Sequence, residues 1–566
     1  MGSVVEELRL VPPGSDKLDI IPLGGLGEFG INAMAWRWGE EMILIDAGMM
    51  FPDESLPGVD VVIPDFTFLQ QHAAQLKAII LTHPHEDHIG AVPYLLRSVN
   101  APIYGTRFTL AVLDHKLAEH GLLDEADLHP VEPGDRIRIP PFDIEFVRST
   151  HSTIDCLVVA IQTPVGMVVH ATDFKLDETP VIGQPLDIDR LRAIGDRGVL
   201  AVLADSTNVE RPGRTPSERA VIPAFEEIFE TSPGRLIFSC FASSIHRIQV
   251  ILDLAHEYGC RVVVLGRTMV RMVETAIDEG FLDVPPGLLV PVSALGRIPR
   301  EDVVMLVTGC QGEPMSALAR MATGSYKQVA IEPGDTVVLS ARIIPGNEKA
   351  IARLIDHIYR RGGRVIDESV RPVHVSGHPS QEDLRILLDA IRPRYLVPIH
   401  GDYRRLCRHR EFALSLGWDP HRVLVAENGQ IIELSPHGAR VSAERVPVGR
   451  ILIDEAGYEE VEEVVVRDRR HLAADGFLLP IVTINEVTGE LEGVPEIITR
   501  GFVSHNGTDE LLDEARQVVI DTVAASSQDE STDWAVMKEK IRVALKRFIA
   551  RRTDRYPLII PVIIEI

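Results

Sequence analysis

The sequence predicts an α/β protein made of several domains. Its 566 residues exceed the size of one ordinary domain. Before residue 215, apolar runs of strand length repeatedly end in polar residues, as buried strands do when they carry functional groups at their ends. Between about residues 215 and 370, short apolar strands alternate with helices, which favours a mostly parallel sheet.

The composition is typical of a globular protein, with 45% hydrophobic and 25% charged residues. No apolar run reaches the ~20 residues that a membrane helix needs, and residues 1–19 lack a signal-peptide core. The cysteines show no CxxC spacing, so the sequence predicts neither a disulfide framework nor a cysteine zinc site; they are Cys156, Cys240, Cys260, Cys310 and Cys407. We therefore expect a cytoplasmic protein that does not span a membrane.

The formal net charge is −26. Taken alone, this charge argues against a nucleic-acid partner, because phosphate binding needs cations. The local field matters more than the total, however, and two divalent ions with a few arginines in a cleft can reverse its sign.

Three imidazoles and a carboxylate lie in one short segment, Thr82–His88. This segment follows the apolar run Lys77–Leu81, which predicts a buried strand, and it precedes a predicted helix. Imidazole and carboxylate groups are ligands that suit zinc and manganese. A lone HxH pair would indicate a polar surface loop, whereas HxHxDH directly after a buried strand predicts a site for two adjacent metal ions.

Two later strands also end in a candidate ligand. The alternating strand 143–151 ends at His151, and the strand 167–173 ends at Asp173. His170 lies inside the second of these strands, so we expect a packed histidine there.

Three further features are predicted to be structural. The glycine-rich turn 24–30 is not followed by a helix pattern, so the sequence does not predict a dinucleotide site. The strand 42–48 carries Asp46, which we expect to support ligands rather than to bind metal. The strand 200–208 ends in a polar tip.

The alternating region begins at about Thr215, which we expect to be the N-cap of a helix over 216–230. Further helices are predicted over 246–258 and 346–361, and strands over 235–240, 261–265, 303–307 and 336–340. Because ligand-like motifs resume after this region, we expect an α/β domain inserted into the first domain.

Histidines return in the segment Val373–His378, which contains an HxSGH motif. A helix is predicted over 381–391, and the strand 394–400 ends at His400. His400 is therefore the last candidate ligand along the chain.

The C-terminal region predicts a separate α+β domain of about 100 residues. We expect a three-stranded meander over 477–503, two amphipathic helices and a closing strand over 558–564. Met537, Ile541 and Leu545 recur at helical spacing, which predicts a buried helix face. The region has no ligand-like cluster, so we expect it to support self-association rather than catalysis.

The HxHxDH motif is the signature of the metallo-β-lactamase superfamily, and this resemblance implies an αββα sandwich with metals at one edge of the sheets. The HxSGH motif and His400 resemble the β-CASP branch, which acts on nucleic acids. Two positions depart from the usual pattern, because Cys310 stands in place of Ser and Ser244 in place of Asn or His. Nearly the whole chain is similar to the bacterial ribonuclease J family, with matches at Ser206–Asn208, Phe241–Ser243, Thr308–Pro314 and Ile344–Glu348.

The resemblance implies a division of the chain into five segments. The metallo-β-lactamase domain is expected in two parts, 1–214 and 371–449, with the β-CASP domain at 215–370 between them. A linker over 450–462 and a C-terminal α+β domain over 463–566 complete the expected chain.

The resemblance also implies site residues. Two divalent ions are expected per chain, Zn²⁺ first and Mn²⁺ or Mg²⁺ as alternatives, with Asp173 bridging them; one ion takes His83, His85 and His151, and the other takes Asp87, His88 and His400. The candidates for catalysis are Asp87, His378 and His374. His378 would protonate the leaving 3′-oxygen, and His374 is either its helper or a structural support. The expected substrate-binding residues are Ser239, Ser243, Ser244, His374, Val375, Ser376, Gly377 and His378.

The implied activity is hydrolysis of RNA, as a 5′-to-3′ exonuclease that prefers 5′-monophosphate ends and also as an endonuclease, in rRNA processing and mRNA decay. The implied partners are single-stranded RNA, further copies of the chain in a homodimer or homotetramer, and other RNA-decay proteins. The alternatives are a DNA-directed β-CASP nuclease and a non-catalytic RNA-binding subunit. A thioesterase or lactonase fits less well, because small-substrate members lack both the insertion and HxSGH.

Overall fold

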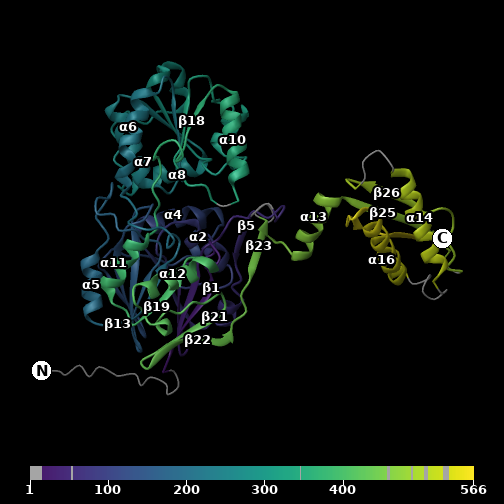
Figure 1. Cartoon of the computed structure of the whole chain (residues 1–566), viewed down its shortest axis with the longest axis horizontal. Coiled ribbons are helices and arrows are strands. Elements are labelled where there is room, and N and C mark those ends of the chain that lie inside the picture. Colours follow the sequence, from purple (N-terminus) through teal and green to yellow (C-terminus); the bar gives the residue numbers. More distant parts are fainter. Residues whose placement is uncertain are drawn as a thin grey trace. The chain divides into compact units, whose positions relative to one another are not determined.

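The structure is a computed structural model that describes residues 16–52, 55–344, 346–454, 459–485, 488–502, 508–526 and 534–566. The chain divides into two compact units (Figure 1); the first is Met1–Met50 with Ile63–Arg450, and the second is Phe51–Val62 with Ile451–Ile566. Among the helices that the structure describes, none is both long and apolar enough to cross a membrane.

The first unit contains a sandwich of two β-sheets. One of them is an eight-stranded mixed sheet, in the order β22-β21-β1-β3-β4-β6-β7-β8. Its strands are β1 (Leu18–Gly24), β3 (Ala33–Trp38), β4 (Glu41–Ile45), β6 (Leu76–Ile80), β7 (Ile103–Gly105), β8 (Leu128–Pro130), β21 (Gln430–Ser435) and β22 (Gly438–Arg445). The helices between these strands are α1 (Thr67–Gln71), α2 (Glu86–Ile89), α3 (Val92–Leu96) and α4 (Arg107–Glu119).

The second sheet of the sandwich has six strands, in the order β19-β13-β12-β11-β10-β9. The strands are β9 (Arg136–Ile139), β10 (Phe142–Ser149), β11 (Cys156–Thr163), β12 (Gly166–Ala171), β13 (Val199–Asp205) and β19 (Tyr395–Ile399). β13 runs parallel to both β12 and β19, and Asp205 pairs in register with Ile399. The carboxyl ends of strands that are far apart in the sequence therefore meet at one edge.

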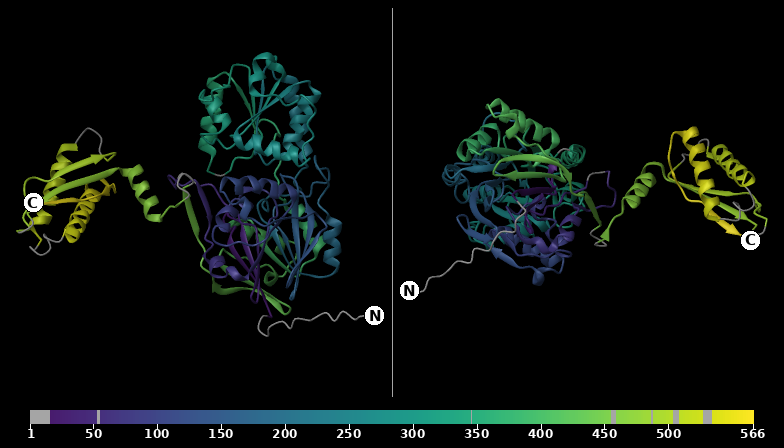
Figure 2. Two further views of the ribbon diagram at one scale, coloured as in Figure 1. Left: turned by 180° about the vertical axis from the view of Figure 1, so that it is seen from behind. Right: turned by 90° about the horizontal axis from the view of Figure 1, so that it is seen from below.

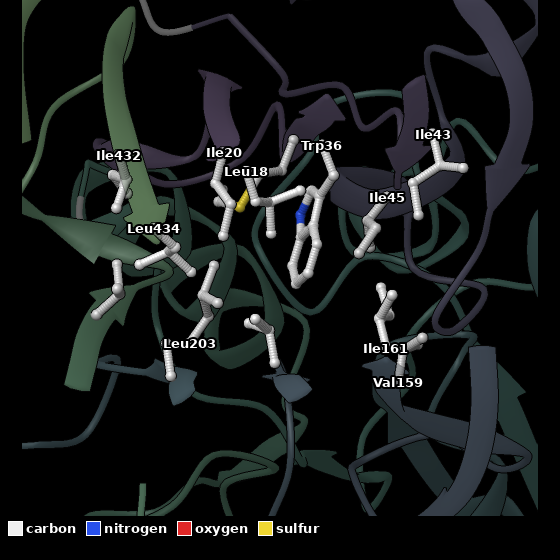
Figure 3. Close-up of a cluster of buried hydrophobic side chains, with 14 of the residues drawn as sticks. Leu18, Ile20, Trp36, Ile43, Ile45, Val159, Ile161, Leu203, Ile432 and Leu434 are labelled. Atoms are coloured by element: carbon white, nitrogen blue, oxygen red, sulfur yellow. The ribbon is translucent and has the colours of Figure 1, made fainter. Parts of the chain in front are cut away.

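The hydrophobic core of the sandwich lies between the two sheets (Figure 3). Trp36 and Ile45 of the first sheet face Val159 and Leu203 of the second, and all four are at most 1% exposed. The outer face of the second sheet is also apolar and packs under three helices, which are α5 (Ile188–Asp196), α11 (Gln381–Ile391) and α12 (Tyr403–Ser415). Because both faces of this sheet are covered, its central strands are continuously apolar rather than alternating.

Between β13 and β19 the chain forms a separate five-stranded, fully parallel sheet, in the order β15-β16-β14-β17-β18. Its strands are β14 (Leu236–Ser239), β15 (Arg261–Leu265), β16 (Val303–Val307), β17 (Thr336–Leu339) and β18 (Arg364–Ile366). Helices cover both faces (Figures 1 and 2): α6 (Ile222–Thr231), α7 (Ile245–Glu257), α8 (Arg267–Asp278), α9 (Ala317–Thr323) and α10 (Glu348–Arg360). The expected inserted α/β domain with a parallel sheet is confirmed.

In the residues that the structure describes, the second unit contains two small sheets and three helices. The first sheet has the order β24-β23-β5 and is built from β5 (Val61–Pro64), β23 (Arg450–Asp454) and β24 (Glu459–Glu460). The second sheet contains β25 (Phe477–Ile484), β26 (Glu496–Arg500), β27 (Leu558–Ile559) and β28 (Val562–Glu565), and the helices are α13 (Glu463–Asp475), α14 (Thr508–Ala524) and α16 (Trp534–Thr553). Alternate side chains of β25 are buried, and they pack with the apolar faces of α14 and α16, including Met537, Ile541 and Leu545.

Two predictions of local structure are wrong. The region 477–503 is not a three-stranded meander, because β25 pairs with β26 on one side and with β27 and β28, in parallel, on the other; Val503 lies outside the described residues. Thr215 is not a helix N-cap, since its N–H and hydroxyl groups donate to Asp383 and to the backbone oxygen of His378. Instead Ser217 caps a 3-10 turn, and α6 begins at Ile222.

Candidate metal centre

The seven candidate ligands stand at the ends of five segments that the two sheets bring together. His83 and His85 follow β6, and Asp87 and His88 lie on α2. The other three ligands, His151, Asp173 and His400, follow β10, β12 and β19. The ligand atoms fall into two overlapping groups, and within each group they lie within 4.8 Å of one another.

The first group has its nitrogen atoms spaced as a tetrahedral metal site requires. His85 Nδ1 lies 3.0 Å from His83 Nε2 and 3.2 Å from His151 Nε2. Asp173 Oδ2 lies 3.6 Å from the first of these Nε2 atoms and 3.5 Å from the second. Zinc–nitrogen bonds of about 2.0–2.1 Å give ligand separations of roughly 3.3 Å in a tetrahedron. The donor set therefore fits one ion of this kind.

The second group shares Asp173 with the first. Asp173 Oδ1 lies 3.5 Å from His88 Nε2 and 3.3 Å from His400 Nε2. Asp87 Oδ2 lies 3.6 Å from His88 Nε2 and 3.3 Å from His400 Nε2. Because Asp173 presents one carboxylate oxygen to each group, it is placed to bridge two ions. That these side chains bind metal stays a prediction.

Hydrogen bonds behind the rings fix the orientation of several candidate ligands. Asp46 accepts from His88 Nδ1 at 2.7 Å and from Thr82 Oγ1 at 2.9 Å, and that hydroxyl accepts from His83 Nδ1 at 3.0 Å. Thr207 Oγ1 lies 2.8 Å from His400 Nδ1. With Nδ1 engaged in this way, each Nε2 atom is turned toward the site. Asp46 thus has the supporting position that the sequence predicts.

Two features of the backbone shape this site. Asp46 and His400 adopt positive φ angles of 60° and 54°, a strained conformation for residues other than glycine that concentrates at functional sites. Gly377 approaches His151 so closely that an added Cβ would lie 2.6 Å from the ring, while its backbone oxygen accepts from Nδ1 at 2.7 Å. Only glycine fits there without displacing a candidate ligand.

The two groups differ in electrostatics. Burial, reinforced by neighbouring imidazoles, lowers the pKa of His83, and burial likewise lowers the pKa of His85 to about 4. Burial also tends to lower the pKa of His88 and His400, but the carboxylates of Asp173 and Asp87 outweigh this effect. The pKa of both histidines is therefore raised, that of His400 to about 9. The pKa of Asp173 is held low by these histidines against the effect of burial. The first group therefore offers neutral imidazoles to a cation, whereas His88 and His400 are protonated beside ionised carboxylates and would release their protons on binding a metal.

His378 of the HxSGH motif lies beside both groups and forms a hydrogen bond with Asp205, a pairing that the sequence did not predict. Its Nδ1 atom donates to Asp205 Oδ2 at 2.7 Å, and its ring centroid lies 4.9 Å from that of His151 and 5.4 Å from that of His400. Burial lowers its pKa, but Asp205 and Asp173 outweigh that effect, so the pKa is raised. The only sequence signal for Asp205 was the polar tip of the strand 200–208.

His374, in contrast, is tied into a buried network. Its Nδ1 accepts from Arg247 Nη1 at 2.9 Å, and burial together with this arginine lowers the pKa of His374 to about 3. Arg247 also pairs with Glu218 through Nε at 2.7 Å and donates to the backbone oxygen of Val375. A neutral histidine held in this way favours the structural alternative over the role of catalytic helper. Arg247 and Glu218 had no sequence signal.

The remaining predicted substrate residues occupy different environments. Ser376 Oγ accepts from Asn208 Nδ2 at 2.8 Å. Ser243 and Ser244 precede α7, where Ser243 is half-buried and Ser244 is buried. Ser239 is fully buried, and its hydroxyl has no hydrogen-bond partner within the described part of the chain. The structure therefore gives no surface for Ser239 to meet a substrate.

Four family models match successive parts of the chain. They are the beta-lactamase superfamily domain (residues 41–188), the ribonuclease J beta-CASP domain (233–358), the Zn-dependent metallo-hydrolase RNA specificity domain (363–423) and the ribonuclease J C-terminal domain (464–566). Ribonuclease J2 of Bacillus subtilis is 37% identical over 552 residues, which cover 98% of this chain and 99% of that protein. The chain belongs to the ribonuclease J family. Ribonuclease J of Thermus thermophilus is 39% identical over 557 residues, 97% of this chain and 96% of its own length.

A crystal structure of a protein of unknown function from Enterococcus faecalis shares the fold. It is 15% identical, has a TM-score of 0.50 and covers 77% of this chain and 100% of its own chain. The expected architecture of a ribonuclease J family member is confirmed: a metallo-β-lactamase domain, an inserted β-CASP domain and a C-terminal domain.

Proposed function

We propose that this chain is a two-metal ribonuclease. It degrades single-stranded RNA from the 5′ end, prefers a 5′-monophosphate, and also cleaves internally, in rRNA processing and mRNA decay. The observation that carries the proposal is the pair of ligand groups joined by Asp173, directly beside the HxSGH loop. Membership of the ribonuclease J family and the RNA-specificity model over residues 363–423 support RNA as the substrate.

In this proposal the three neutral imidazoles of His83, His85 and His151 would hold the first ion, Asp87, His88 and His400 would hold the second, and Asp173 would contribute to both. When bound, two such ions neutralise the phosphate and bring the pKa of water near ~7, so that a nucleophile exists at neutral pH. Zn²⁺ matches the nitrogen-rich first group, whereas Mn²⁺ or Mg²⁺ would rely on the carboxylates.

The protein's own contribution to bond cleavage is the proton for the leaving 3′-oxygen. His378 is the proposed donor, because Asp205 holds Nδ1 and raises the pKa of the ring, which leaves Nε2–H to be given up. His374 supports the loop through Arg247 and does not exchange a proton near neutral pH.

The 5′ end is proposed to bind where the HxSGH loop meets the start of α7. The Ser376 hydroxyl lies on this loop, and Gly377 lets the loop pack closely against His151. Ser243 and Ser244 precede α7, whose N-terminus favours an anion. Such a pocket suits one phosphate, since a triphosphate would add both charge and bulk.

We further propose that the chain acts in the cytoplasm as a homodimer or homotetramer, with other RNA-decay proteins as partners. The C-terminal region exposes several apolar side chains that a subunit interface would cover; they are Val464, Val465, Leu472, Val494, Ile560 and Ile564.

The deciding experiment is product analysis on one 5′-labelled single-stranded RNA, with Mn²⁺ or Mg²⁺ added, next to a single-stranded DNA of the same sequence. The expected result is a labelled mononucleotide as the first product, together with a few internal fragments. Faster hydrolysis of the DNA would favour the DNA-directed nuclease, and an RNA that stays bound but intact would favour a non-catalytic subunit.

A further inference from the structure

The glycine-rich turn that the predicted mechanism does not use carries an exposed aromatic ring to the metal centre. The turn is clamped beside His400, because Leu26 of β2 (Leu26–Gly27) pairs with Gly401 of β20 (Gly401–Asp402). Phe29, two residues after the end of β2, is 38% exposed. Its ring lies edge-on to His400, with a centroid separation of 6.1 Å and an interplanar angle of 73°.

One face of the Phe29 ring carries the guanidinium of Arg405. The Cζ atom of Arg405 lies 4.9 Å from the ring centroid. Two hydrogen bonds hold the guanidinium in place, from Nε to the Thr207 backbone oxygen at 3.0 Å and from Nη1 to Asp402 at 2.5 Å. Aromatic rings and arginine planes are the two platforms on which unpaired bases stack. This pair is therefore a preformed stacking platform.

Two more arginines extend the positive charge of Arg405. The pKa of Arg342 is lowered, first by burial and then by the charges of Arg211 and Arg405, while Glu368 opposes the shift. Arg342 Nη1 donates to Asn208 Oδ1 at 3.4 Å. Within the described ranges, neither Arg211 nor Arg342 forms an ion pair. The backbone N–H of Arg211 donates to the backbone oxygen of Asn208 at 2.8 Å, so Asn208 contacts both of these arginines. The like charges of the three guanidinium groups repel one another, and a phosphate among them would relieve that repulsion.

The polar tip after β13 connects these side chains to the reacting centre. Thr207 contacts both Arg405, through its backbone oxygen, and His400, through its hydroxyl at 2.8 Å. Asn208 contacts both Arg342 and Ser376. Phe29 thus packs on a ligand of the second group, whereas the HxSGH loop packs on His151 of the first group.

From this arrangement we propose that these side chains form an RNA-contact site for the strand on the 3′ side of the scissile phosphate. A base stacks on Phe29, and the three arginines hold the neighbouring phosphates. The inference rests on the proposed function, since it places the 5′ end at the HxSGH loop. It also explains how a chain of net charge −26 holds a polyanion, because the cations gather where the strand leaves the metals.

The test uses the full-length protein with Phe29→Ala, Phe29→Trp and Arg342→Gln variants. RNA affinity is measured by fluorescence anisotropy with a 5′-monophosphorylated single strand in chelator, over a series of salt concentrations. Phe29→Ala should weaken binding roughly 10-fold, and Phe29→Trp should restore it. Arg342→Gln should lower the slope of log affinity against log salt by about 1. With metal present, KM should rise in both weakened variants, and kcat should change little.

Matched controls are Tyr359→Ala, an exposed aromatic residue on α10, and Arg192→Gln, an exposed arginine on α5. Both should behave as the wild type. A nucleoside 5′-monophosphate should bind Phe29→Ala as it binds the wild type, because it occupies only the 5′ pocket; an equal loss for this ligand would overturn the 3′ placement. If the wild type hydrolyses RNA while Phe29→Ala and Arg342→Gln bind it unchanged, the inference fails alone. A wild type that hydrolyses no RNA overturns the proposed function and the inference with it.

Discussion

His378 donates a hydrogen bond from Nδ1 to Asp205 Oδ2 over 2.7 Å, and both residues lie beside Asp173, whose carboxylate belongs to both groups of candidate ligands. The carboxylate can only accept, so this bond fixes which ring nitrogen carries the remaining proton. Because Asp205 is fully buried at the end of β13, the orientation of the ring is set by the sheet rather than by the loop.

Asp205→Asn is therefore expected to lower kcat by about 10- to 100-fold while KM stays within a few-fold, since the change disturbs a supporting contact. Asp205→Glu should recover part of the loss. Single-turnover kinetics on a 5′-monophosphorylated RNA measure the effect. Asp419→Asn, at an exposed turn, is the control and should keep wild-type kcat. Equal kcat for Asp205→Asn and wild type would show that His378 needs no partner, or donates no proton.

Metal content should follow the two groups of ligands. The wild type is expected to hold two divalent ions per chain, and the His85→Ala variant is expected to hold one. The Asp173→Asn variant should hold fewer ions than His85→Ala, because the Asp173 carboxylate belongs to both groups. Elemental analysis after gel filtration measures this, and chelation should abolish hydrolysis. His129→Gln, an exposed histidine paired with Asp127, is the control and should retain two ions. Full hydrolysis in chelator would contradict the two-metal proposal.

The positions of the candidate ligands could be predicted because each one is a local feature. His83, His151 and His400 all lie at or just after the end of a segment with a strand pattern, and the ends of neighbouring strands gather at one edge of a sheet. The role of Asp205 could not be predicted, because it depends on the register of β13 against β19, which are far apart in the sequence. Local propensity also assigned Thr215 to a helix N-cap, whereas a tertiary contact with Asp383 uses its N–H.

The network of buried ion pairs around Glu218 could not be predicted from the sequence for the same reason. Lys175 follows β12, Glu218 lies in a 3-10 turn and Arg247 lies on α7, and no periodicity connects these three positions. The strand pairing of the C-terminal unit could not be predicted either. β28 looks like an ordinary closing strand in the sequence, and only long-range pairing makes it parallel to β25.

The C-terminal region is expected to mediate assembly. A truncated chain that ends at Gly449 lacks nearly all of the second unit but keeps the core of the sandwich. It should therefore fold, and it should be a monomer where the full-length chain is an oligomer. Light scattering gives the mass, and hydrolysis of a short RNA should persist. The same oligomer for the truncated and the full-length chain would mean that the first unit makes the subunit contacts.

The 5′ phosphate should control the rate of exonucleolytic cleavage. One RNA bearing a monophosphate, a triphosphate or a hydroxyl at its 5′ end is compared in a time course, and mononucleotide release should be fastest from the monophosphate. Ser376→Ala should reduce that preference, because it removes a hydroxyl from the proposed pocket while Asn208 can still donate to the backbone oxygen of His378. Equal rates from all three ends would contradict the pocket, and release from the 3′ end would contradict the polarity.

The buried ion pairs of Glu218 should make the stability of the first unit depend on acid. Burial opposes ionisation of Glu218, but Arg247 and Lys175 outweigh it and lower the pKa to about 2 from an ordinary value of 4.5. A lowered folded-state pKa means that the stabilisation is fully present above pH 4.5 and is lost as the pH falls toward 2. Removing one member of such a buried pair costs about 3–5 kcal/mol, because the partner charges remain desolvated.

Glu218→Gln should therefore lower the Tm of the first unit strongly at pH 7, and the gap to the wild type should narrow as the pH falls below 4.5. Differential scanning fluorimetry across this range measures both effects. Glu178→Gln removes the exposed partner of Arg214 and is the control; a surface pair is worth at most about 1 kcal/mol, so its Tm should stay close to that of the wild type. If the Tm difference between Glu218→Gln and the wild type widened below pH 4.5, ionised Glu218 would not be the stabilising form. An unchanged Tm at pH 7 would show that Glu218 does not anchor the Arg247–His374 contact.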